Sequence, residues 1–357
     1  MKIKSYRGQY EVVFTNDFVT CLQKEIQDKD IFLVDEQVSN LYSDQLAGLR
    51  QSHSFINLPS GEKTKSFDAA GKLIEKLMQM NFKRNHRLIA LGGGIVQDAV
   101  AFVASIIFRG VDWFFVPTTL LAQGDSCIGS KTSVNFEDCK NLLGGFHPPA
   151  KVFVDSQFLG SLNETEIRSG LGEMLHFFMI SGNEDYNFFR ENFRRCLAEP
   201  LQTNILTRRS LEIKKAMIER DEFDMGPRKI FNYGHTFGHA LEGVTDYAIP
   251  HGLAVCYGMD LANHVSVHLG FLDSSVCLQC REFLAELWDG CEFPAVEIDR
   301  YLALLAKDKK NVGNNLNLIL TRGLGDMFMC EVESNKALAG VIEQCLASYS
   351  SQSICSK

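Results

Sequence analysis

The sequence predicts an N-terminal α/β domain built on a mostly parallel sheet, followed by a C-terminal helical domain. In residues 1–160, short apolar runs alternate with helical patterns, which is typical of parallel strands joined by helical crossovers. In residues 161–357, the periodic segments have the spacing of helices. A length of 357 residues is also comfortable for two domains.

Four apolar runs of the N-terminal part are expected to be strands, because each is short, rich in branched or aromatic residues and bounded by turn residues. They cover residues 30–35, 87–94, 111–119 and 150–158. Two helices are expected between them, over residues 66–82 and 95–108. After residue 160 the sequence looks all-helical, with helices over residues 163–180, 205–223, 234–244, 251–270, 275–290 and 335–349.

Composition and charge exclude several classes of function. The hydrophobic fraction of 45% and the charged fraction of 22% are those of an ordinary globular protein. A net charge of −8 argues against a nucleic-acid partner. No apolar run reaches about 18 residues and the first residues lack a signal-peptide pattern, so we expect no membrane span and a cytoplasmic location. The 11 cysteines are expected to be reduced.

A triple-glycine turn is the first candidate site. Gly92, Gly93 and Gly94 lie between an expected strand and an expected helix. Glycines there let backbone N–H groups approach a phosphate, which the helix N-terminus attracts, although a plain tight turn has the same residues. Asp35 ends an earlier strand, where its carboxylate either accepts from ribose hydroxyls or caps the next helix.

The stretch VPTTLLAQGDSCIGSKTSVN places polar side chains among apolar ones. Burial of Asp125 or Lys131 would be costly without a partner, so they form a structural ion pair or Lys131 binds an anion. Lys140 and Asn141 follow in a glycine-rich loop that could close over a ligand.

Two histidines of the stretch FNYGHTFGHALE raise the question of a metal site. His235 and His239 are four residues apart, so they share one face of a helix. His251 begins the next expected helix, and Glu173 interrupts an apolar stripe three residues before His176. These residues are either buried core side chains or, if they converge, two histidines and a carboxylate that hold a metal with one open position.

Several basic side chains accompany these histidines and together predict a small polyanionic substrate. Each base considered alone is more typical of a solvated surface charge. The group consists of Arg109, Lys131, Lys140, Lys214, Arg228 and one lysine of the pair Lys309 and Lys310.

Taken in order, the motifs resemble the 3-dehydroquinate synthase family of sugar phosphate cyclases over about residues 59–313. The segments that carry the resemblance are PSGEKTKS, GGGIVQD, FRG, VPTTLLAQGDSCIGSKTSVN, KNLLGGF, SGLGEMLH, DEFDMGPRKIFNYGHTFGHALE, PHG and KDKKNVG. The resemblance implies a Rossmann-like NAD-binding domain over residues 1–160. It also implies a helical domain over residues 161–357 that binds substrate and a divalent metal, zinc or cobalt.

The resemblance also implies roles for individual residues. The metal ligands match Glu173, His235 and His251. The NAD-binding positions match Asp35, Glu62, Lys65, Gly93, Gly94, Asp98, Thr118, Thr119, Asp125, Lys131 and Lys140. The substrate-contacting and catalytic positions match Lys131, Asn141, Lys214, Arg228, Asn232, His239, Lys310 and Arg109. The family is usually a homodimer, and Arg109 matches an arginine lent to the neighbouring active site.

The implied activity is that of a carbon–oxygen lyase, which converts a seven-carbon keto-acid sugar phosphate to 3-dehydroquinate in the shikimate pathway of aromatic amino acid biosynthesis. NAD accepts a hydride and returns it, the metal polarises the reacting oxygen, phosphate is eliminated and a carbocycle closes. The alternatives are a cyclase for a different sugar phosphate, a metal-dependent polyol dehydrogenase and a non-catalytic binding paralogue.

Three positions depart from the family pattern. His176 stands where the family usually has lysine, and Ser130 and Gln97 stand where it usually has glycine. Replacement of the lysine removes a permanent charge near the substrate, which leaves the exact substrate open. The spacing of Glu173 and His176 also raises the hypothesis that His176 reaches the metal or orients its carboxylate ligand.

Overall fold

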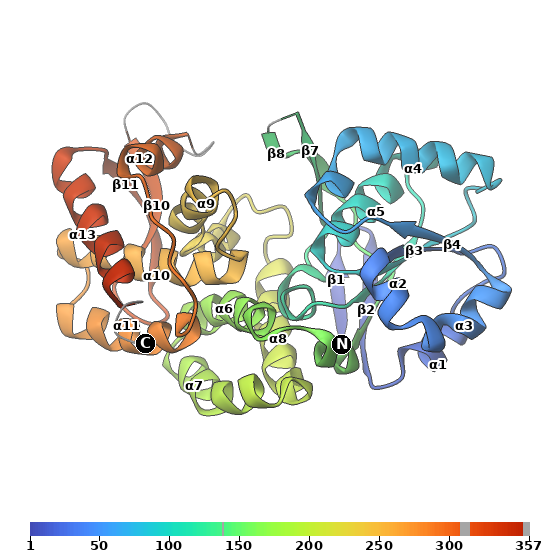
Figure 1. Cartoon of the computed structure of the whole chain (residues 1–357), viewed down its shortest axis with the longest axis horizontal. Coiled ribbons are helices and arrows are strands. Elements are labelled where there is room, and N and C mark those ends of the chain that lie inside the picture. The colour runs from blue at the N-terminus through green and yellow to red at the C-terminus, as the bar shows by residue number, and fades with distance from the viewer. Residues whose placement is uncertain (138, 308–314, 353–357) are drawn as a thin grey trace. The chain divides into compact units, whose positions relative to one another are not determined.

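A computed structural model describes residues 1–137, 139–307 and 315–352. The chain forms two compact units (Figure 1). The first unit comprises Met1–Leu162 and Pro200–Phe223, and the second comprises Asn163–Glu199 and Asp224–Lys357. No helix in the described ranges combines the length and hydropathy that a membrane span requires.

The first unit is built on a seven-stranded sheet with the order β1-β2-β9-β6-β5-β3-β4. β1 and β2 are antiparallel, and the other neighbouring strands are parallel. The strands are β1 (Lys2–Ser5), β2 (Gly8–Thr15), β3 (Ile31–Asp35), β4 (Ser54–Leu58), β5 (Leu88–Gly92), β6 (Trp113–Pro117) and β9 (Lys151–Asp155). A separate antiparallel hairpin consists of β7 (Lys131–Phe136) and β8 (Cys139–Phe146).

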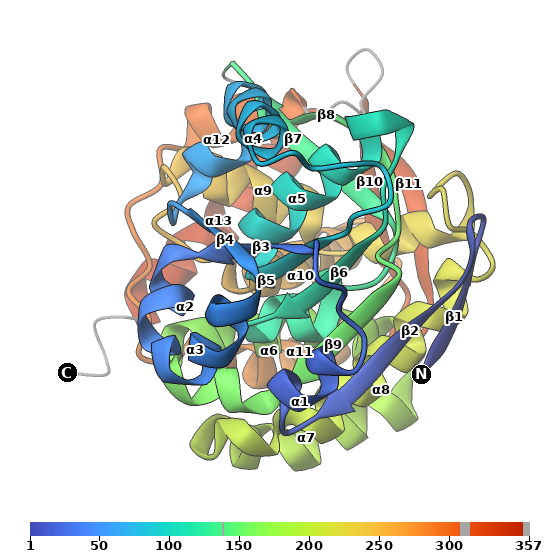
Figure 2. The same cartoon turned by 90° about the vertical axis from the view of Figure 1, so that its right-hand side faces the viewer.

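Helices cover both faces of the sheet, as Figure 2 shows. Alternate strand residues point to opposite faces, so Leu33 and Ala90 belong to one core and Phe32 and Ile89 to the other. The first core packs against α4 (Phe67–Gln79), α5 (Gly94–Ile106) and α8 (Asn204–Ile218). The second core packs against α1 (Phe18–Gln23), α3 (Ser43–Ser52) and η4 (Ser156–Ser161). The doubly covered parallel sheet and its near-continuous apolar strands confirm the predicted α/β class.

Shorter elements connect these strands and helices. They are α2 (Glu36–Leu41), η1 (Glu62–Lys65), η2 (Ile107–Arg109), η3 (Ala122–Ser126) and η5 (Pro200–Thr203).

The expected single boundary after residue 160 differs from the observed division. Pro200–Phe223 lies within the C-terminal part of the sequence but packs with the first unit. Ser210 Oγ donates a hydrogen bond of 2.7 Å to the carbonyl of Gly124, and Leu211 and Ile218 are fully buried in the core beneath the sheet. The apolar face of α8 therefore decides to which unit this segment belongs.

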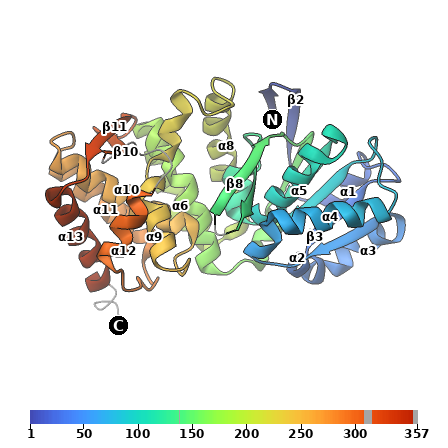
Figure 3. The same ribbon diagram turned by 90° about the horizontal axis from the view of Figure 1, so that it is seen from above.

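The second unit is helical, as predicted, and α10 contacts α6, α9, α11 and α13 (Figure 3). Its helices are α6 (Glu164–Ser181), α7 (Asn183–Ala198), η6 (Pro227–Asn232), α9 (His235–Val244), α10 (His251–His268), α11 (Ser274–Trp288), α12 (Ile298–Ala306) and α13 (Lys336–Gln352).

One hairpin departs from the all-helical expectation for the second half. β10 (Asn315–Thr321) and β11 (Met327–Glu333) pair antiparallel. The backbone N–H of Thr321 donates a hydrogen bond of 3.1 Å to Ser266 Oγ, which ties the hairpin to α10. The alternation of polar and apolar residues in NLNLILT has the period of a strand, which accounts for the difference.

Candidate active site

Glycines bring three helices of the second unit unusually close together. A Cβ atom on Gly252 of α10 would lie 1.7 Å from the Ser169 carbonyl oxygen of α6. A Cβ atom on Gly258 of α10 would lie 1.9 Å from the carbonyl oxygen of Gly234, the residue before α9. Gly234 itself has a φ of +80°, a conformation that glycine adopts without a steric cost. Close backbone contact therefore fixes how α6, α9 and α10 face one another.

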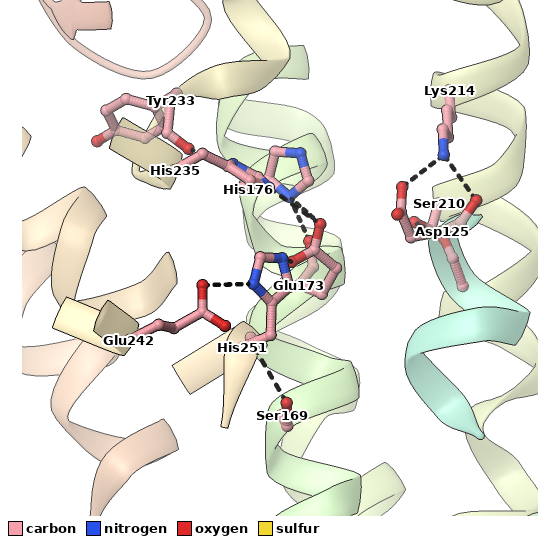
Figure 4. A network of polar contacts seen from close by, with 12 residues as sticks. Asp125, Ser169, Glu173, His176, Ser210, Lys214, Tyr233, His235, Glu242 and His251 are labelled. Carbon is pink, nitrogen blue, oxygen red and sulfur yellow. Dashed lines mark hydrogen bonds and ion pairs between the residues drawn. The ribbon is translucent and has the colours of Figure 1, made fainter. Parts of the chain in front are cut away.

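The three residues predicted as metal ligands lie together at this contact (Figure 4). Glu173 Oε1 lies 3.4 Å from His235 Nε2, and Glu173 Oε2 lies 3.3 Å from His251 Nε2. Glu173 is 2% exposed, so its carboxylate is almost completely shielded from water. One carboxylate thus faces two imidazoles that come from two other helices.

The histidines decide the charge state of Glu173. Burial alone raises the pKa of the carboxyl group, because an ion is poorly solvated inside a protein. The neighbouring His235 and His251 outweigh burial and lower the pKa well below its ordinary value. Glu173 is therefore a carboxylate, the form that binds cations.

The donor set fits a divalent metal ion. Glu173 Oε2 is buried and makes no hydrogen bond to any residue in the described ranges. Two imidazole nitrogens and a carboxylate are ligands that zinc and cobalt accept, and three protein ligands leave a position for substrate or water. Paired with no cation, a buried carboxylate of this kind would be costly.

Glu242 supports the cluster but was missing from the predicted site residues. Its Oε2 atom lies 3.1 Å from His251 Nδ1, on the side of the ring opposite Glu173. Histidines that bind metals commonly donate their second N–H group to a carboxylate, which fixes the ring and its tautomer. A signal was available, because Glu242 follows His235 by seven residues and His239 by three, on one helical face.

His239 lies beside the cluster and is exposed. Its ring centroid is 5.6 Å from those of both His235 and His251. His239, Glu242 and His251 form a second group whose ligand atoms lie close enough to share an ion. Of the two histidines in the motif, His235 is therefore the one that faces Glu173.

Another cluster of possible ligands already contains a cation. Asp260, His264 and Cys345 lie close together in the second unit. Arg281 Nη1 lies 3.0 Å from His264 Nε2 and 3.4 Å from Asp260 Oδ2. The guanidinium group therefore supplies the positive charge that the buried Asp260 needs.

The triple-glycine turn of the first unit lies at the carboxyl end of β5, where it begins α5. A Cβ atom on Gly93 would lie 2.9 Å from Thr119 Cγ2, so the turn packs directly against the second residue after β6. A Cβ atom on Gly94 would meet no described atom within 4 Å. Backbone at a helix N-terminus beside open space is an arrangement that accommodates a phosphate.

Most of the predicted NAD-binding residues follow the ends of the parallel strands. Asp35 ends β3, Thr118 and Thr119 follow β6, and η1 with Glu62 and Lys65 follows β4. Ligands of such sheets bind beyond the carboxyl ends of the strands. Asp35 also caps α2, because its Oδ1 atom accepts a hydrogen bond of 2.8 Å from the Gln37 N–H group.

Four charged members of this group form two ion pairs in the first unit. Lys65 Nζ lies 2.5 Å from Asp98 Oδ2, and Lys140 Nζ lies 3.6 Å from Glu62 Oε1. Burial raises the pKa of Asp98, and Lys65 opposes this shift. Asn135 joins two of the elements, since its amide nitrogen donates a hydrogen bond of 2.8 Å to Glu62.

Asp125 pairs with Lys214 instead of Lys131. Lys214 Nζ lies 2.6 Å from Asp125 Oδ1 and 2.7 Å from its backbone carbonyl. The expected ion pair of Asp125 with Lys131 is therefore wrong in its cation, which comes from α8. Lys131 is exposed at the start of β7, and the side-chain oxygen of the exposed Asn141 accepts a hydrogen bond of 3.0 Å from Ser133.

The remaining predicted residues belong to both units. Arg109 is exposed in the first unit, whereas Arg228 is buried in η6 of the second. The Asn232 amide donates a hydrogen bond of 2.9 Å to the Lys229 carbonyl. Lys309 and Lys310 lie outside the described residues.

The two departures from the family pattern in the first unit have local partners. Gln97 donates a hydrogen bond of 2.6 Å to the Ser126 carbonyl and accepts one of 2.6 Å from the Ser126 hydroxyl. Ser130 has a φ of +66°, which favours glycine, and its hydroxyl donates a hydrogen bond to Glu222. Glu222 also accepts a hydrogen bond of 2.7 Å from the Ser5 hydroxyl.

Two replacements of Ser130 separate the cost of its left-handed backbone conformation from the contribution of its hydrogen bond to Glu222. Ser130→Ala keeps the Cβ atom but loses the bond to Glu222, and we expect it to lower the free energy of unfolding by about 2 kcal/mol. Ser130→Gly loses the same bond but relieves the left-handed conformation, so it should be about 1 kcal/mol more stable than the alanine variant. Urea unfolding of both variants measures the difference. Equal stability of the two would contradict this account.

A Rossmann-like unit with a glycine turn, joined to a helical unit with a carboxylate–histidine cluster, defines a class of two-domain cofactor-dependent enzymes. Residues 55–169 match the family described as 3-dehydroquinate synthase N-terminal, and residues 170–311 match 3-dehydroquinate synthase C-terminal. The chain belongs to the 3-dehydroquinate synthase family, whose members are carbon–oxygen lyases and use NAD and a divalent metal.

Similar proteins of known sequence and structure agree with this assignment. A 3-dehydroquinate synthase of Alkaliphilus metalliredigens (strain QYMF) is 37% identical over 305 residues, which cover 84% of this chain and 85% of the relative. A 2-epi-5-epi-valiolone synthase from Streptomyces hygroscopicus, solved with NAD+ and Zn2+, has a TM-score of 0.85 at 24% identity and covers 96% of this chain and 97% of its own. A 2-deoxy-scyllo-inosose synthase, solved with carbaglucose-6-phosphate, NAD+ and Co2+, has a TM-score of 0.84 at 23% identity. The match covers 96% of this chain and 99% of that synthase. These two structures establish the fold.

Proposed function

We propose that the protein is a 3-dehydroquinate synthase, which converts a seven-carbon keto-acid sugar phosphate to 3-dehydroquinate with loss of phosphate. The observation that supports this most is the convergence of Glu173, His235 and His251 in a chain that matches both halves of the family. The 37% identity to a protein of that name over 84% of the chain favours this substrate class. The product would enter the shikimate pathway of aromatic amino acid biosynthesis.

When bound, NAD would accept and return a hydride, and the metal would act as a Lewis acid on the substrate. Glu173, His235 and His251 would hold the metal, and Glu242 would orient His251. The backbone at Gly93 and Gly94 would hold the pyrophosphate at the N-terminus of α5. The rest of the predicted NAD-binding group would contact other parts of the cofactor: Asp35, Glu62, Lys65, Asp98, Thr118, Thr119, Asp125, Lys131 and Lys140.

Basic and amide side chains would bind and orient the anionic substrate. Charge-assisted hydrogen bonds to phosphate and carboxylate groups hold a substrate in a reactive orientation without covalent chemistry. We assign this role to Lys131, Asn141, Lys214, Arg228, Asn232, His239 and Lys310. Lys214 forms an ion pair with Asp125 at 2.6 Å, so the substrate would have to compete with this carboxylate for the ammonium group.

We also propose a homodimer in which Arg109 serves the neighbouring subunit. Phe108 and Arg109 have φ angles of 51° and 67°, and this strained conformation presents an exposed arginine beside an aromatic side chain that is 39% exposed. Strained turns of this kind concentrate at functional positions. The expected dimer mass in solution, and loss of turnover without loss of metal in Arg109→Ala, would test this arrangement.

A phosphate-release assay tests the proposed reaction. The purified protein, supplied with NAD and Zn2+ or Co2+, is expected to release phosphate from the seven-carbon keto-acid sugar phosphate and to form 3-dehydroquinate. NADH should not accumulate, because the cofactor is regenerated in each turnover. Phosphate release without 3-dehydroquinate, or no release at all, would contradict the proposal.

A cyclase for a different sugar phosphate is the second candidate. The observation that favours it is His176, which lies 1% exposed beside Glu173 and brings no permanent charge to the cluster. Phosphate release from a hexose phosphate or a heptulose phosphate, with none from the keto acid, would support this candidate. Stoichiometric NADH release from a polyol would instead indicate a dehydrogenase, and a protein that binds NAD and metal without turnover would be a binding paralogue.

The supporting role of Glu242 leads to a prediction of its own. Glu242→Ala removes the carboxylate at His251 Nδ1, so zinc affinity is expected to fall by about 10–100-fold, as is usual for such partners. Competition with a chromophoric chelator measures the affinity. Glu331→Ala, which removes an exposed carboxylate of β11, is the control and should bind zinc like the parent protein. Unchanged affinity in Glu242→Ala would contradict the role.

A further inference from the structure

We infer that His176 is a positioning residue of the metal cluster, which holds Glu173 and His235 in the orientation that binds the ion. The inference rests on the proposed function, because it takes Glu173 and His235 to be ligands. In this inference His176 orients Glu173 and His235 and does not itself bind the metal.

His176 lies in the interior of the second unit beside the cluster. It follows Glu173 by three residues on α6, so both side chains lie on one face of that helix. The residue is 1% exposed. Its ring lies 3.8 Å from the ring of Phe177 and 6.1 Å from that of Phe231, centroid to centroid. The aromatic neighbours restrict the imidazole to one orientation, because a close-packed ring cannot rotate freely.

Nδ1 of His176 faces Glu173 in two ways (Figure 4). It forms a hydrogen bond with the backbone carbonyl of Glu173 and lies 3.7 Å from the carboxylate atom Oε1. A carbonyl oxygen accepts only, so Nδ1 must carry the proton. That N–H group lies next to the carboxylate atom that faces His235, and it favours this position of the carboxylate.

The ring of His176 also contacts the second ligand. Its centroid lies 5.0 Å from the centroid of His235 with an interplanar angle of 75°, an edge-to-face arrangement. One buried ring therefore touches both the carboxylate and an imidazole of the cluster. Holding two ligands before the ion arrives reduces the conformational freedom that binding removes, which raises affinity.

Two isosteric replacements separate a hydrogen-bonding role from simple packing. His176→Asn keeps an amide N–H group near the place of Nδ1, whereas His176→Gln places its amide near Nε2. We expect the glutamine variant to bind Zn2+ about 10–100-fold more weakly, the usual loss for a residue that orients a ligand, and the asparagine variant to retain most of the affinity. His268→Asn, an exposed histidine of α10, is the control for loss of an imidazole.

The measurement is competition of the metal-free full-length protein with a chromophoric chelator for Zn2+, supported by the visible spectrum of bound Co2+. Equal Zn2+ affinity of both His176 variants and the parent protein would overturn the inference. A greater loss of Zn2+ affinity in the asparagine variant than in the glutamine variant would also overturn it, because that order indicates packing alone. Glu173→Gln in the same titration tests the proposed function separately. If the parent protein binds no more tightly than Glu173→Gln, the proposed metal site itself fails.

Discussion

Glu173→Gln is expected to abolish tight binding of the divalent metal and the proposed phosphate release with it. Glutamine has nearly the shape of glutamate but no charge, so the change removes the anion that faces His235 and His251 at 3.4 and 3.3 Å. The loss of affinity should exceed the roughly 100-fold that loss of a supporting residue costs. Metal content after dialysis and phosphate release measure the two effects.

A control on the same helix isolates the role of this carboxylate. Glu164→Gln alters a carboxylate of α6 whose side chain is 67% exposed, and it should leave metal content and turnover unchanged. Wild-type metal stoichiometry in Glu173→Gln, at unchanged affinity, would show that the cluster is not the metal site.

Gly258→Ala and Gly252→Ala are expected to have the largest effects on stability. A Cβ atom would lie 1.9 Å from the Gly234 carbonyl oxygen in the first variant and 1.7 Å from that of Ser169 in the second. Because both contacts are with backbone, whole helices must move apart, and we expect a loss of about 3 kcal/mol or more in the free energy of unfolding. Chemical denaturation followed by circular dichroism measures this loss.

Gly340→Ala is the matched control, since a Cβ atom there meets no described atom within 4 Å and the residue lies inside α13. It should stabilise the protein by about 0.5–1 kcal/mol, the ordinary preference of a helix for alanine over glycine. If Gly258→Ala were as stable as Gly340→Ala, close packing of α9 and α10 would not be what holds the histidines in place.

The fold was predictable where the hydrophobic pattern is strong. The buried runs of β3, β5, β6 and β9 follow from their length, residue types and bounding turn residues, and the long helices α5 and α10 follow from their helical patterns. The edge strands β1 and β4, their neighbour β2 and the short helix α1 were not predicted, because they depend on partners distant in sequence. The hairpin β10–β11 was not predicted either, although the alternation in NLNLILT indicates a strand. The position of α8 depends on such partners too.

The candidate site was predictable to a smaller extent. The spacing of His235 and His239 indicates a shared helix face, but only the resemblance selected His235 and His251 as the pair that joins Glu173. Sequence spacing cannot show which residues of three separate helices meet, because close backbone contact at glycines decides this. The same limit applies to Asp125, whose partner Lys214 lies far along the chain.

The division of the chain into units also decides how it can be recombined with relatives. The chain passes between the units at Leu162–Asn163, Glu199–Pro200 and Phe223–Asp224. A chimera joined at a single point near residue 160 would combine a foreign α8 with the native sheet. The foreign residues at positions 211 and 218 would then pack against a core that is suited to Leu211 and Ile218. An exchange of the helical unit between two family members therefore needs to keep residues 200–223 with the sheet of the first unit.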